Sequence, residues 1–318
     1  MTTQERFAVN YGEVIVDMVA GDTGSLVEVE TFLKRFGGAP ANTAVGLGRL
    51  DVPVALIGKV GSDPFGIYMK QTLENNNVDT SGLVLTRRFP TTMSFVSLQE
   101  DGERDFLFAP GAHDRLRSEE VELPPNAKIL HFGSLLQIRP EAQETTNKLL
   151  RQAAKRGVLT SYDPNIRETL WGDLGRARDT VLETAKHVSI MKVNETEAEL
   201  LSGTNDIAEA AVRLFQPNMD TLFITLGPQG CYVMTKHGAI HVEVPISVTP
   251  VDTTGAGDAF NAGYLAGIYD SGRMYSDMSQ ADLIRYVKRA AVIGALATTE
   301  KGAISALPTR EMLTQYGY

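Results

Sequence analysis

The sequence predicts a single α/β domain with a mostly parallel central sheet, and two observations indicate this fold. Short apolar runs at residues 129–132, 158–162, 188–193 and 221–226 alternate with helix-length amphipathic segments. Such alternation is typical of strand–helix–strand units, which place parallel strands in one sheet with helices on both faces. The 318 residues also contain no linker, low-complexity tract or internal repeat, and 43% of them are apolar, enough for one large core.

The first element is a strand predicted over residues 7–17, ending at Asp17. A carboxylate at the carboxyl end of a strand lies where open α/β sheets place ligand contacts. A loop acid or a helix cap is the alternative interpretation of Asp17.

A glycine turn and a helix follow, in the run Gly-Gly-Ala-Pro-Ala-Asn that begins at Gly37. Proline suits a first helical turn, and helical spacing continues to residue 50. Gly37 and Gly38 would let the backbone approach a ligand, and Asn42 could exchange hydrogen bonds with hydroxyl groups. A plain glycine turn before a helix is the alternative.

The remaining elements follow in order. Strands are expected at residues 54–60, 92–98, 105–108, 230–234 and 239–244, and helices at residues 64–75, 141–156, 173–186, 207–215, 256–269 and 281–298. An Asp-Gly turn joins 92–98 to 105–108, a strong hairpin signal. The segments at about 18–36 and 91–109 do not follow the alternating pattern, so we expect them to form a small β lid.

Residues 251–260, Val-Asp-Thr-Thr-Gly-Ala-Gly-Asp-Ala-Phe, carry the densest chemistry. Gly255, Ala256 and Gly257 precede a helix, and small residues at a helix N-terminus form a cradle for an anion. Asp258 beside a phosphate site makes sense as a base that takes a proton from the attacking nucleophile. A glycine turn with an acid favoured in the first helical turn is the alternative.

Composition excludes several classes of protein. A net charge of -9 disfavours nonspecific binding to nucleic acid or anionic membranes. No apolar run approaches the ~18 residues of a membrane span, and the N-terminus has no apolar signal core, so we expect a cytoplasmic protein. No lysine precedes Ser or Thr, which excludes a Walker-type P-loop.

Residues 37–66 and 252–260 together resemble the two signatures of the ribokinase/PfkB family of sugar kinases. Residues 161–171, 192–197 and 99–106 resemble its fructokinase branch. The resemblance implies a ribokinase-like three-layer α/β domain spanning residues 1–318. It also implies an ATP-dependent kinase that converts fructose to fructose 6-phosphate. A kinase for 2-keto-3-deoxygluconate or another small sugar or nucleoside is the alternative, and a catalytically silent regulatory relative is a remote one.

The resemblance further implies roles for individual residues. Asp258 would be the base, and Gly255, Ala256 and Gly257 would hold the developing phosphate charge. The residues implied in sugar binding are Asp17, Gly37, Gly38, Asn42, Arg104, Phe106, Arg167 and Asp258. Those implied in ATP binding are Asn194, Glu197, Thr225, Gly227, Gly230 and Gly257.

Two metal ions are implied by the same resemblance. Glu197 would bind Mg²⁺ through water, and Asp252 and Thr254 are candidates for a K⁺ site. The alternative for Asn194 and Glu197 is a helix capping box, which is compatible with the metal role. For Arg104 the alternative is a solvated hairpin charge.

Two further expectations concern specificity and assembly. After Phe108 the fructokinase branch often has an arginine-asparagine-proline run, whereas this chain continues Ala-Pro-Gly-Ala-His-Asp. This departure leaves the exact sugar open. Because an exposed sheet edge tends to be covered, we also expect a homodimer through the lid strands.

Overall fold

The predicted parallel sheet is present as a nine-stranded sheet in the computed structural model, which describes residues 8–99, 103–273 and 275–318. Its strand order is β13-β12-β11-β10-β9-β8-β1-β4-β5. All neighbours from β11 to β5 run parallel, and β12 and β13 add an antiparallel hairpin at one edge. The strands are β1 (Ala8–Tyr11), β4 (Val54–Gly61), β5 (Val78–Thr86), β8 (Ile129–Phe132), β9 (Leu159–Tyr162), β10 (Ile190–Asn194), β11 (Thr221–Thr225), β12 (Cys231–Thr235) and β13 (Gly238–Val242).

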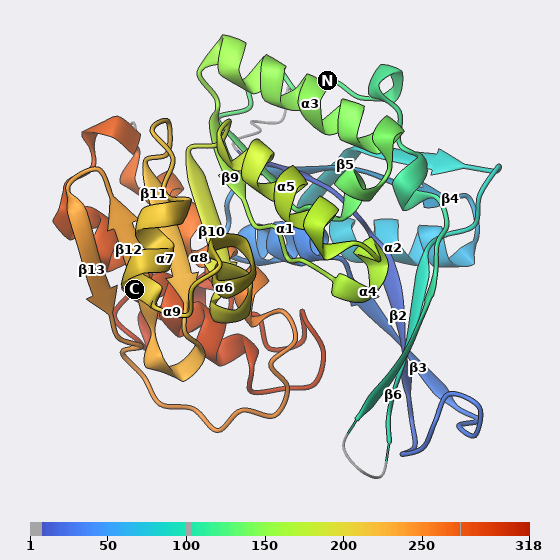
Figure 1. Cartoon of the computed structure of the whole chain (residues 1–318). Helices are drawn as coiled ribbons and strands as arrows, with labels where there is room; N and C mark the ends of the chain where they lie inside the picture. Colours follow the sequence, from blue (N-terminus) through green and yellow to red (C-terminus); the bar gives the residue numbers. More distant parts are fainter. Residues whose placement is uncertain (1–7, 100–102, 274) are drawn as a thin grey trace.

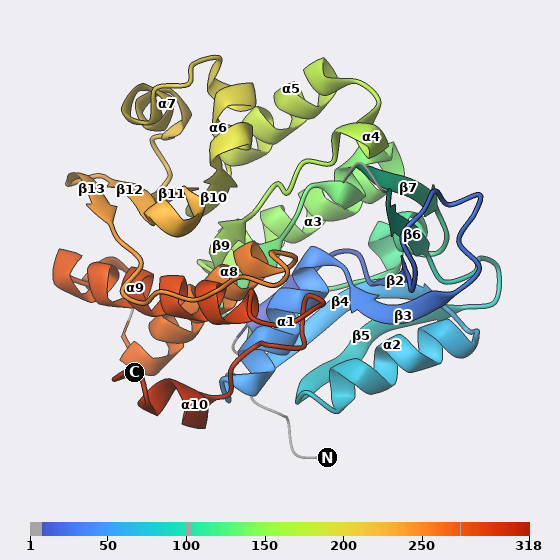
Figure 2. The same cartoon turned by 90° about the horizontal axis from the view of Figure 1, so that it is seen from below.

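Helices cover both faces of this sheet, which gives the expected three layers (Figure 2). One core cluster joins the sheet to α1 (Ala39–Arg49), α2 (Pro64–Glu74), α8 (Ala256–Ser271) and α9 (Gln280–Ala297). The other cluster joins it to α3 (Pro140–Arg156), α5 (Leu174–Ala185), α6 (Glu195–Ser202) and α7 (Ile207–Leu214). Short turns of helix complete the described chain: α4 (Glu168–Trp171), α10 (Arg310–Thr314), η1 (His113–Arg115), η2 (Ser118–Glu120), η3 (Leu135–Ile138), η4 (Gly227–Gln229) and η5 (Tyr275–Asp277).

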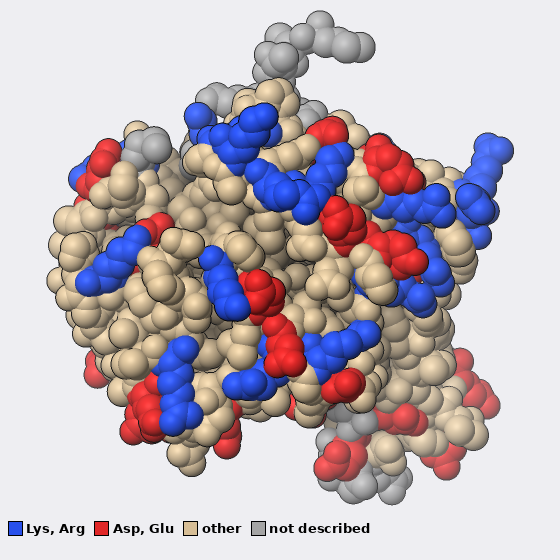
Figure 3. Space-filling view, turned by 45° about the horizontal axis from the view of Figure 1, so that its top comes forward, with Lys and Arg blue, Asp and Glu red and all other residues tan. Residues whose placement is uncertain are grey.

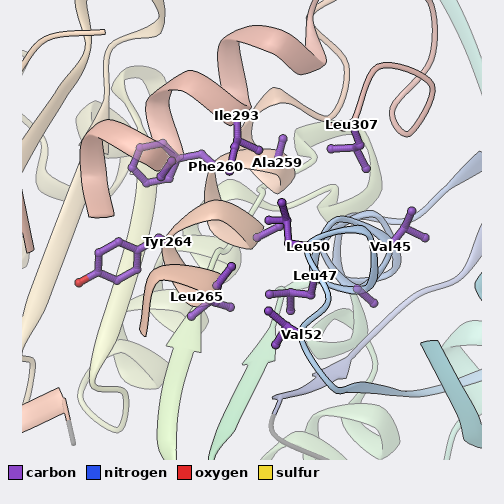
Figure 4. Close-up of a cluster of buried hydrophobic side chains, with 14 of the residues drawn as sticks. Val45, Leu47, Leu50, Val52, Ala259, Phe260, Tyr264, Leu265, Ile293 and Leu307 are labelled. Carbon is purple, nitrogen blue, oxygen red and sulfur yellow. The ribbon is translucent and has the colours of Figure 1, made fainter. Parts of the chain in front are cut away.

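Helices α1 and α8, far apart in the chain, pack directly against each other. Figure 4 shows their apolar side chains interleaved, with Leu47 of α1 and Leu50, which directly follows α1, facing Leu265 of α8. A Cβ atom on Gly46 would lie only 2.6 Å from the Cβ of Ala262, so the two backbones approach closely. This packing brings the N-terminal ends of both helices to the same place.

A second sheet of four strands extends away from the layered body (Figure 1). Its order is β3-β2-β6-β7, with β2 (Ile15–Ala20), β3 (Phe32–Gly37), β6 (Met93–Leu98) and β7 (Arg104–Ala109). The pairing of β2 with β6 is parallel and the other two pairings are antiparallel. The hairpin predicted between residues 92 and 108 is therefore confirmed, although residues 100–102 of its turn lie outside the described part of the chain.

We call one side of the second sheet its cleft face. The strand register places nine residues with described side chains on it, namely Asp17, Val19, Leu33, Arg35, Ser94, Val96, Leu98, Phe106 and Phe108. The opposite face includes Val16 and Phe36, which are buried in the main core. The cleft face is therefore the side that is free to meet a ligand.

The single strand predicted over residues 7–17 is wrong. The described part of this segment forms β1 in the large sheet and then β2 in the second sheet. Gly12 stands at the crossing, where a Cβ atom would lie 2.4 Å from the ring of Pro40. The chain changes sheets here because only a glycine fits under the start of α1.

Strand β5 was not predicted. It pairs with β4 at the edge of the large sheet, and the register shifts between Ala55 and Ile57. Its alternation is broken by Ser81 and Gly82, so the period-2 signal is weak. In the described ranges, no helix is long and apolar enough to cross a membrane.

Candidate active site

Asp258 and Asn42 meet where α8 and α1 begin. The Nδ2 atom of Asn42 donates to Oδ2 of Asp258 at 2.8 Å, and both side chains are buried. The hydroxyl of Thr43 donates to the backbone oxygen of Asp258 at 3.3 Å. Two predicted site residues separated by more than two hundred positions therefore touch directly.

The carboxyl group of Asp258 is held in an environment that resists ionisation. Burial raises its pKa to about 7, and the negative charge of Asp163 adds to the effect. The amide of Asn42 and the cations Lys192 and Arg167 act in the opposite direction. A carboxyl group with a pKa near neutrality can accept a proton and release it again at physiological pH.

Gly255 begins helix α8 with a left-handed backbone, at φ 81°. A Cβ atom there would lie within 3 Å of the backbone of Ala303, so glycine is required. No side chain caps this helix N-terminus. The amide of Ala256 makes a long bond to the backbone oxygen of Thr253 at 3.3 Å. The uncapped start of α8 can still donate to an anion, as the predicted cradle of Gly255, Ala256 and Gly257 requires.

A buried ion pair lies beneath the cradle, and it was not predicted. The Nζ atom of Lys192 lies 2.8 Å from Oδ2 of Asp163, and both side chains are buried. The same carboxylate oxygen accepts from Nδ2 of Asn261 at 2.7 Å. A Cβ atom on Gly257 would lie 3.1 Å from Nζ of Lys192, so the ammonium group supports the cradle from below.

The charge of Lys192 is retained despite its burial. Burial alone would lower the pKa of this lysine, but the carboxylates of Asp163, Glu197 and Asp258 raise it instead. A lysine within the apolar run of β10 was the available signal, because lysine is almost never fully buried without a partner. The ion pair between Asp163, directly after β9, and Lys192 of β10 could not be predicted from the sequence of either strand alone.

Glu13 is a second buried acid that sequence analysis missed. Its Oε1 atom accepts from the backbone amide of Ala39 at 3.0 Å, whereas Oε2 is buried without a hydrogen-bond partner. Burial raises the pKa of Glu13 to about 7, and the nearby charge of Asp258 contributes. The N-terminus of α1 is therefore capped by a side chain from the crossing between the two sheets.

Asp17 lies on the cleft face beside the predicted glycine turn. Its Oδ1 atom accepts from the hydroxyl of Ser94 at 2.5 Å, and burial raises its pKa. A Cβ atom on Gly37 would lie 2.1 Å from Oδ2 of Asp17. Gly38 adopts φ 105°, and a Cβ atom there would lie 2.4 Å from the backbone oxygen of Glu13. Both glycines are thus required by close approach.

Asn194 and Glu197 form the capping box of α6. The Oδ1 atom of Asn194 accepts from the amide of Glu197 at 2.8 Å, and Oε2 of Glu197 accepts from the amide of Asn194 at 2.9 Å. The other oxygen of Glu197 accepts from the amide of Ile166 at 2.7 Å. Both carboxylate oxygens are therefore already engaged, although each retains a free lone pair.

The predicted nucleotide residues Thr225, Gly227 and Gly230 follow one another at the end of β11. Thr225 is the last residue of the strand, and Gly227 adopts φ 56° in the turn that follows. Gly230 adopts φ 98°, and a Cβ atom there would lie 2.2 Å from the backbone oxygen of Val242. This turn leads into the β12–β13 hairpin.

Asp252 fastens the segment before the cradle to the segment after α9. Its Oδ1 atom accepts from the amide of Thr254 at 3.0 Å and from its hydroxyl at 2.7 Å. Its Oδ2 atom accepts from the amide of Gly302 at 2.9 Å. The two predicted cation ligands therefore lie together, in contact with the loop that packs on Gly255.

Phe106, Arg167 and Arg104 are the residues predicted at the outer side of the sugar, and the structure describes the side chains of the first two. Phe106 is 40% exposed on the cleft face and stacks on Phe108, with ring centroids 6.4 Å apart. Arg167 is exposed and has no ion pair among the described residues. Burial raises the pKa of Asp17, Asp258 and Glu13, and Arg167 lies close enough to offset part of this rise. The side chain of Arg104 lies outside what the structure describes.

A cavity of about 1560 Å³ lies at the amino ends of strands β8 to β11. None of the predicted site residues lines it. Lysine and arginine side chains gather over the neighbouring helix α3 (Figure 3). Arg151 of this cavity pairs with Glu144, and Arg156 donates to backbone oxygens of Leu123 and Pro124. These cations are used within the fold, so the cavity does not compete with the candidate active site.

The fold and the site define a class of protein. A helix N-terminus open to an anion, with a buried proton acceptor in its first turn, suits transfer of a phosphoryl group to an alcohol. Comparison with known proteins agrees with this class. A model of the pfkB family of carbohydrate kinases matches residues 5–310.

Relatives align over nearly the full chain. Fructokinase-1 of Zea mays is 38% identical over 99% of this chain and 98% of its own. Probable fructokinase-2 of Arabidopsis thaliana is 40% identical over 95% of this chain and 92% of its own. A fructokinase double mutant from Vibrio cholerae O395, solved with fructose, ADP and potassium ion, has a TM-score of 0.87 at 31% identity over 99% of both chains. ATP-bound fructokinase from Xylella fastidiosa has a TM-score of 0.89 at 28% identity, over 99% of this chain and 100% of its own.

The chain therefore belongs to the pfkB family of carbohydrate kinases. The resemblance identified from its motifs is confirmed, as are the ribokinase-like α/β fold and the assignment to phosphotransferases with an alcohol acceptor.

Proposed function

We propose that this chain transfers the γ-phosphate of ATP to the primary hydroxyl of fructose, giving fructose 6-phosphate and ADP. The contact of Asp258 with Asn42, directly behind the cradle, is the observation that carries this proposal. The contact supports the proposal because it brings the buried carboxyl group of Asp258 and the amide of Asn42 together at the uncapped N-terminus of α8. The similarity to curated fructokinases at 38–40% identity supports fructose as the acceptor.

In the proposed reaction, Asp258 removes the proton of the sugar hydroxyl. The oxygen then bonds to the γ-phosphorus as the bond from phosphorus to the ADP oxygen breaks. Charge develops on the transferring oxygens, and the amides of Gly255, Ala256 and Gly257 would stabilise it. The raised pKa of Asp258 suits this exchange, because the carboxyl group holds the proton it has accepted.

The sugar would be bound by Asp17, Gly37, Gly38 and Asn42. The Oδ1 atom of Asn42 is buried without a protein partner, which leaves it available to a hydroxyl group. Asp17 still has lone pairs beyond its bond to Ser94. Phe106, Arg104 and Arg167 would border the outer side of the sugar.

ATP would lie over the ends of β10 and β11, near Asn194, Thr225, Gly227 and Gly230. Glu197 fits a magnesium ion held through water, because its oxygens are hard ligands but already accept two backbone amides. When bound, Mg²⁺ would neutralise charge on the phosphates. Among the described residues no group of three acidic, histidine or cysteine side chains is arranged to hold a metal directly.

A monovalent cation such as K⁺ would bind beside Asp252 and Thr254. The carboxylate of Asp252 supports this site, because it bonds both Thr254 before α8 and Gly302 after α9. A cation there would fix the loop around Gly302 beneath the cradle. The Vibrio cholerae fructokinase structure holds potassium ion together with fructose and ADP. A cytoplasmic location, and the lack of nucleic-acid or membrane partners, remain predictions from sequence.

The alternative acceptor is 2-keto-3-deoxygluconate, and one observation favours it. Arg167 offers an exposed guanidinium near Asp17 that has no described ion-pair partner and could bind a sugar carboxylate. A catalytically silent relative finds no such support, because Asp258 and both cradle glycines are present.

A panel of sugars with coupled detection of ADP tests the proposal. We expect fructose to give the highest kcat/KM, with ketodeoxygluconate, ribose and nucleosides well below it. Phosphorylation of ketodeoxygluconate but not of fructose would replace fructose as the acceptor. No ADP release with any member of the panel would reject the kinase activity.

A homodimer through the second sheet is also proposed. The outer part of the cleft face exposes Val19, Leu33, Leu98 and Phe106, each between 37% and 52% accessible. Apolar residues clustered on one sheet face are typical of an interface. A second copy of this chain would cover them.

A further inference from the structure

Arg35 lies on the cleft face of β3 and has no described partner. Its Cα atom pairs in register with that of Asp17, the acid that opens the candidate sugar site. The side chain is half-buried and makes no ion pair or hydrogen bond with any residue in the described part of the chain. A half-buried guanidinium without an internal partner is available to an external anion.

Asp17 does not occupy this guanidinium. Its carboxylate turns toward Gly37 and accepts the hydroxyl of Ser94. Burial raises the pKa of Asp17, and the cation that opposes this rise is Arg167. Arg35 therefore does not pair with Asp17. It also makes no ion pair with the buried acids Glu13 and Asp258.

The side chain of Arg35 instead crosses to the loop after α9. Its Cδ atom lies 3.9 Å from the position of a Cβ atom on Gly302. Figures 1 and 2 both show this C-terminal segment, in red, next to β3. Ala303, which follows Gly302 in this loop, packs against Gly255, the first glycine of the cradle. Arg35 is therefore one loop away from the amides that would hold a phosphate.

Of the protein side chains, arginine is the best suited to phosphate, because its planar fork binds two oxygens at once. A phosphoryl group in transfer would lie between the cradle and the sugar. Arg35 is near both places, because its Cα atom is in register with that of Asp17 and its Cδ atom approaches Gly302. The site presents Asp17, Asp258 and Glu13 to an incoming triphosphate, and Arg167 is a cation whose charge reaches all three. Arg35 would add a second cation and offset more of their repulsion.

We propose that Arg35 binds the terminal phosphate of the nucleoside triphosphate and stabilises its charge during transfer. This role rests on the proposed kinase function and adds a phosphate contact from the second sheet. It also makes phosphate transfer depend on the position of that sheet over the site.

The test compares two nucleotides that differ in the terminal phosphate. Binding of magnesium ADP and of magnesium AMP-PNP, an analogue that is not hydrolysed, is measured by calorimetry for wild type, Arg35→Ala and Arg35→Lys. We expect Arg35→Ala to weaken AMP-PNP binding about 10- to 100-fold, as for loss of a charged hydrogen bond. ADP binding should stay within about twofold of wild type, and Arg35→Lys should restore part of the loss.

Lys34→Ala is the matched control. Lys34 is the adjacent cation on the same strand, but it lies on the opposite face, 3.7 Å from the ring centre of Tyr68. This variant should bind both nucleotides as wild type does. Thermal unfolding of each variant should show an unchanged Tm, so that a loss of binding is not a loss of fold.

Steady-state kinetics supply a second readout. We expect Arg35→Ala to lower kcat by a factor similar to its loss of AMP-PNP affinity, with the KM for sugar little changed. Equal effects on ADP and AMP-PNP, no effect on either, or a change confined to the sugar KM would each overturn the proposal. The nucleotide comparison needs no sugar, so it decides the role of Arg35 even if fructose proves to be the wrong acceptor.

Discussion

At the scale of single residues, this site concentrates acids that the fold does not neutralise. Asp258 and Glu13 are both fully buried, and burial raises the pKa of each to about 7. Neither makes an ion pair among the described residues, whereas Asp163 is paired with Lys192. Such an arrangement costs stability when the acids are ionised, and it is typical of residues whose pKa is tuned for function.

Replacing Asp258 tests the role of the base. Asp258→Asn keeps the shape and the contact with Asn42 but removes the proton acceptor. We expect kcat to fall about 10²- to 10⁴-fold, while calorimetry shows nucleotide binding retained. Turnover near that of wild type would remove Asp258 from the role of base, and a parallel loss of nucleotide binding would indicate damage to the cradle.

Replacing Glu13 tests the cost of its burial. The folded pKa of about 7 exceeds the ordinary value of 4.5, so the proton on Glu13 stabilises the fold below pH 4.5. That contribution is lost as the pH rises through about 7. A neutral Glu13→Gln side chain can still accept the amide of Ala39 and avoids this loss.

We therefore expect Glu13→Gln to raise the free energy of unfolding at pH 8 by about 1–3 kcal/mol, from the size of the pKa shift. At pH 5 the gain should be much smaller. Urea denaturation at both pH values measures the difference. An equal gain at both pH values would indicate that repacking, and not the buried charge, is responsible.

At the scale of elements, the sequence predicted the alternating strands and helices well because each carries its own apolar period. Helix α3 was expected over residues 141–156 and spans Pro140–Arg156, ending at Gly157 with a left-handed backbone. The glycine pair before Asp258 also marked the start of a helix, which was expected over residues 256–269 and spans Ala256–Ser271.

What the sequence could not reveal depends on contacts between elements. The pairing of Asp163 with Lys192 requires β9 and β10 to be neighbours. The cap that Glu13 gives to Ala39 requires the chain to change sheets at Gly12. Neither contact could be predicted from one segment alone, although Lys192 lies inside the apolar strand β10 and Glu13 between two apolar strands.

The segment around Asp252 gives a prediction at this scale. One carboxylate joins the run before α8 to the loop after α9, and we propose a K⁺ ion beside it. A bound cation should hold this loop, and with it Ala303 under Gly255, in the arrangement that forms the cradle. We expect turnover in potassium chloride to exceed turnover in tetramethylammonium chloride at equal ionic strength.

The same comparison in Asp252→Ala should show a weaker response to potassium, with lower turnover overall. Activity in wild type that does not respond to replacing potassium with the bulky organic cation would reject the cation site. The circular dichroism spectrum should be the same in both salts, which separates a local effect from unfolding.

At the scale of the whole molecule, the site draws on both ends of the chain. Asp17 and Asn42 come from the first fifty residues, and Asp258 and Gly302 from the last seventy. The packing of α1 on α8 closes this long loop in the chain, so the site forms only when the core does (Figure 4). The second sheet adds residues from a part of the molecule that is only partly covered.

The exposed part of the cleft face leads to the last prediction, a homodimer. Leu33 is 52% exposed on this face, and Leu107 is 56% exposed on the opposite face of the same sheet. If a second copy covers the cleft face, Leu33→Glu places an unpaired charge in the interface and should dissociate it, whereas Leu107→Glu should not. Analytical ultracentrifugation should give twice the chain mass for wild type and Leu107→Glu, and a single chain mass for Leu33→Glu. A wild-type monomer at micromolar concentration would contradict the dimer, and dissociation by Leu107→Glu alone would move the interface to the other face.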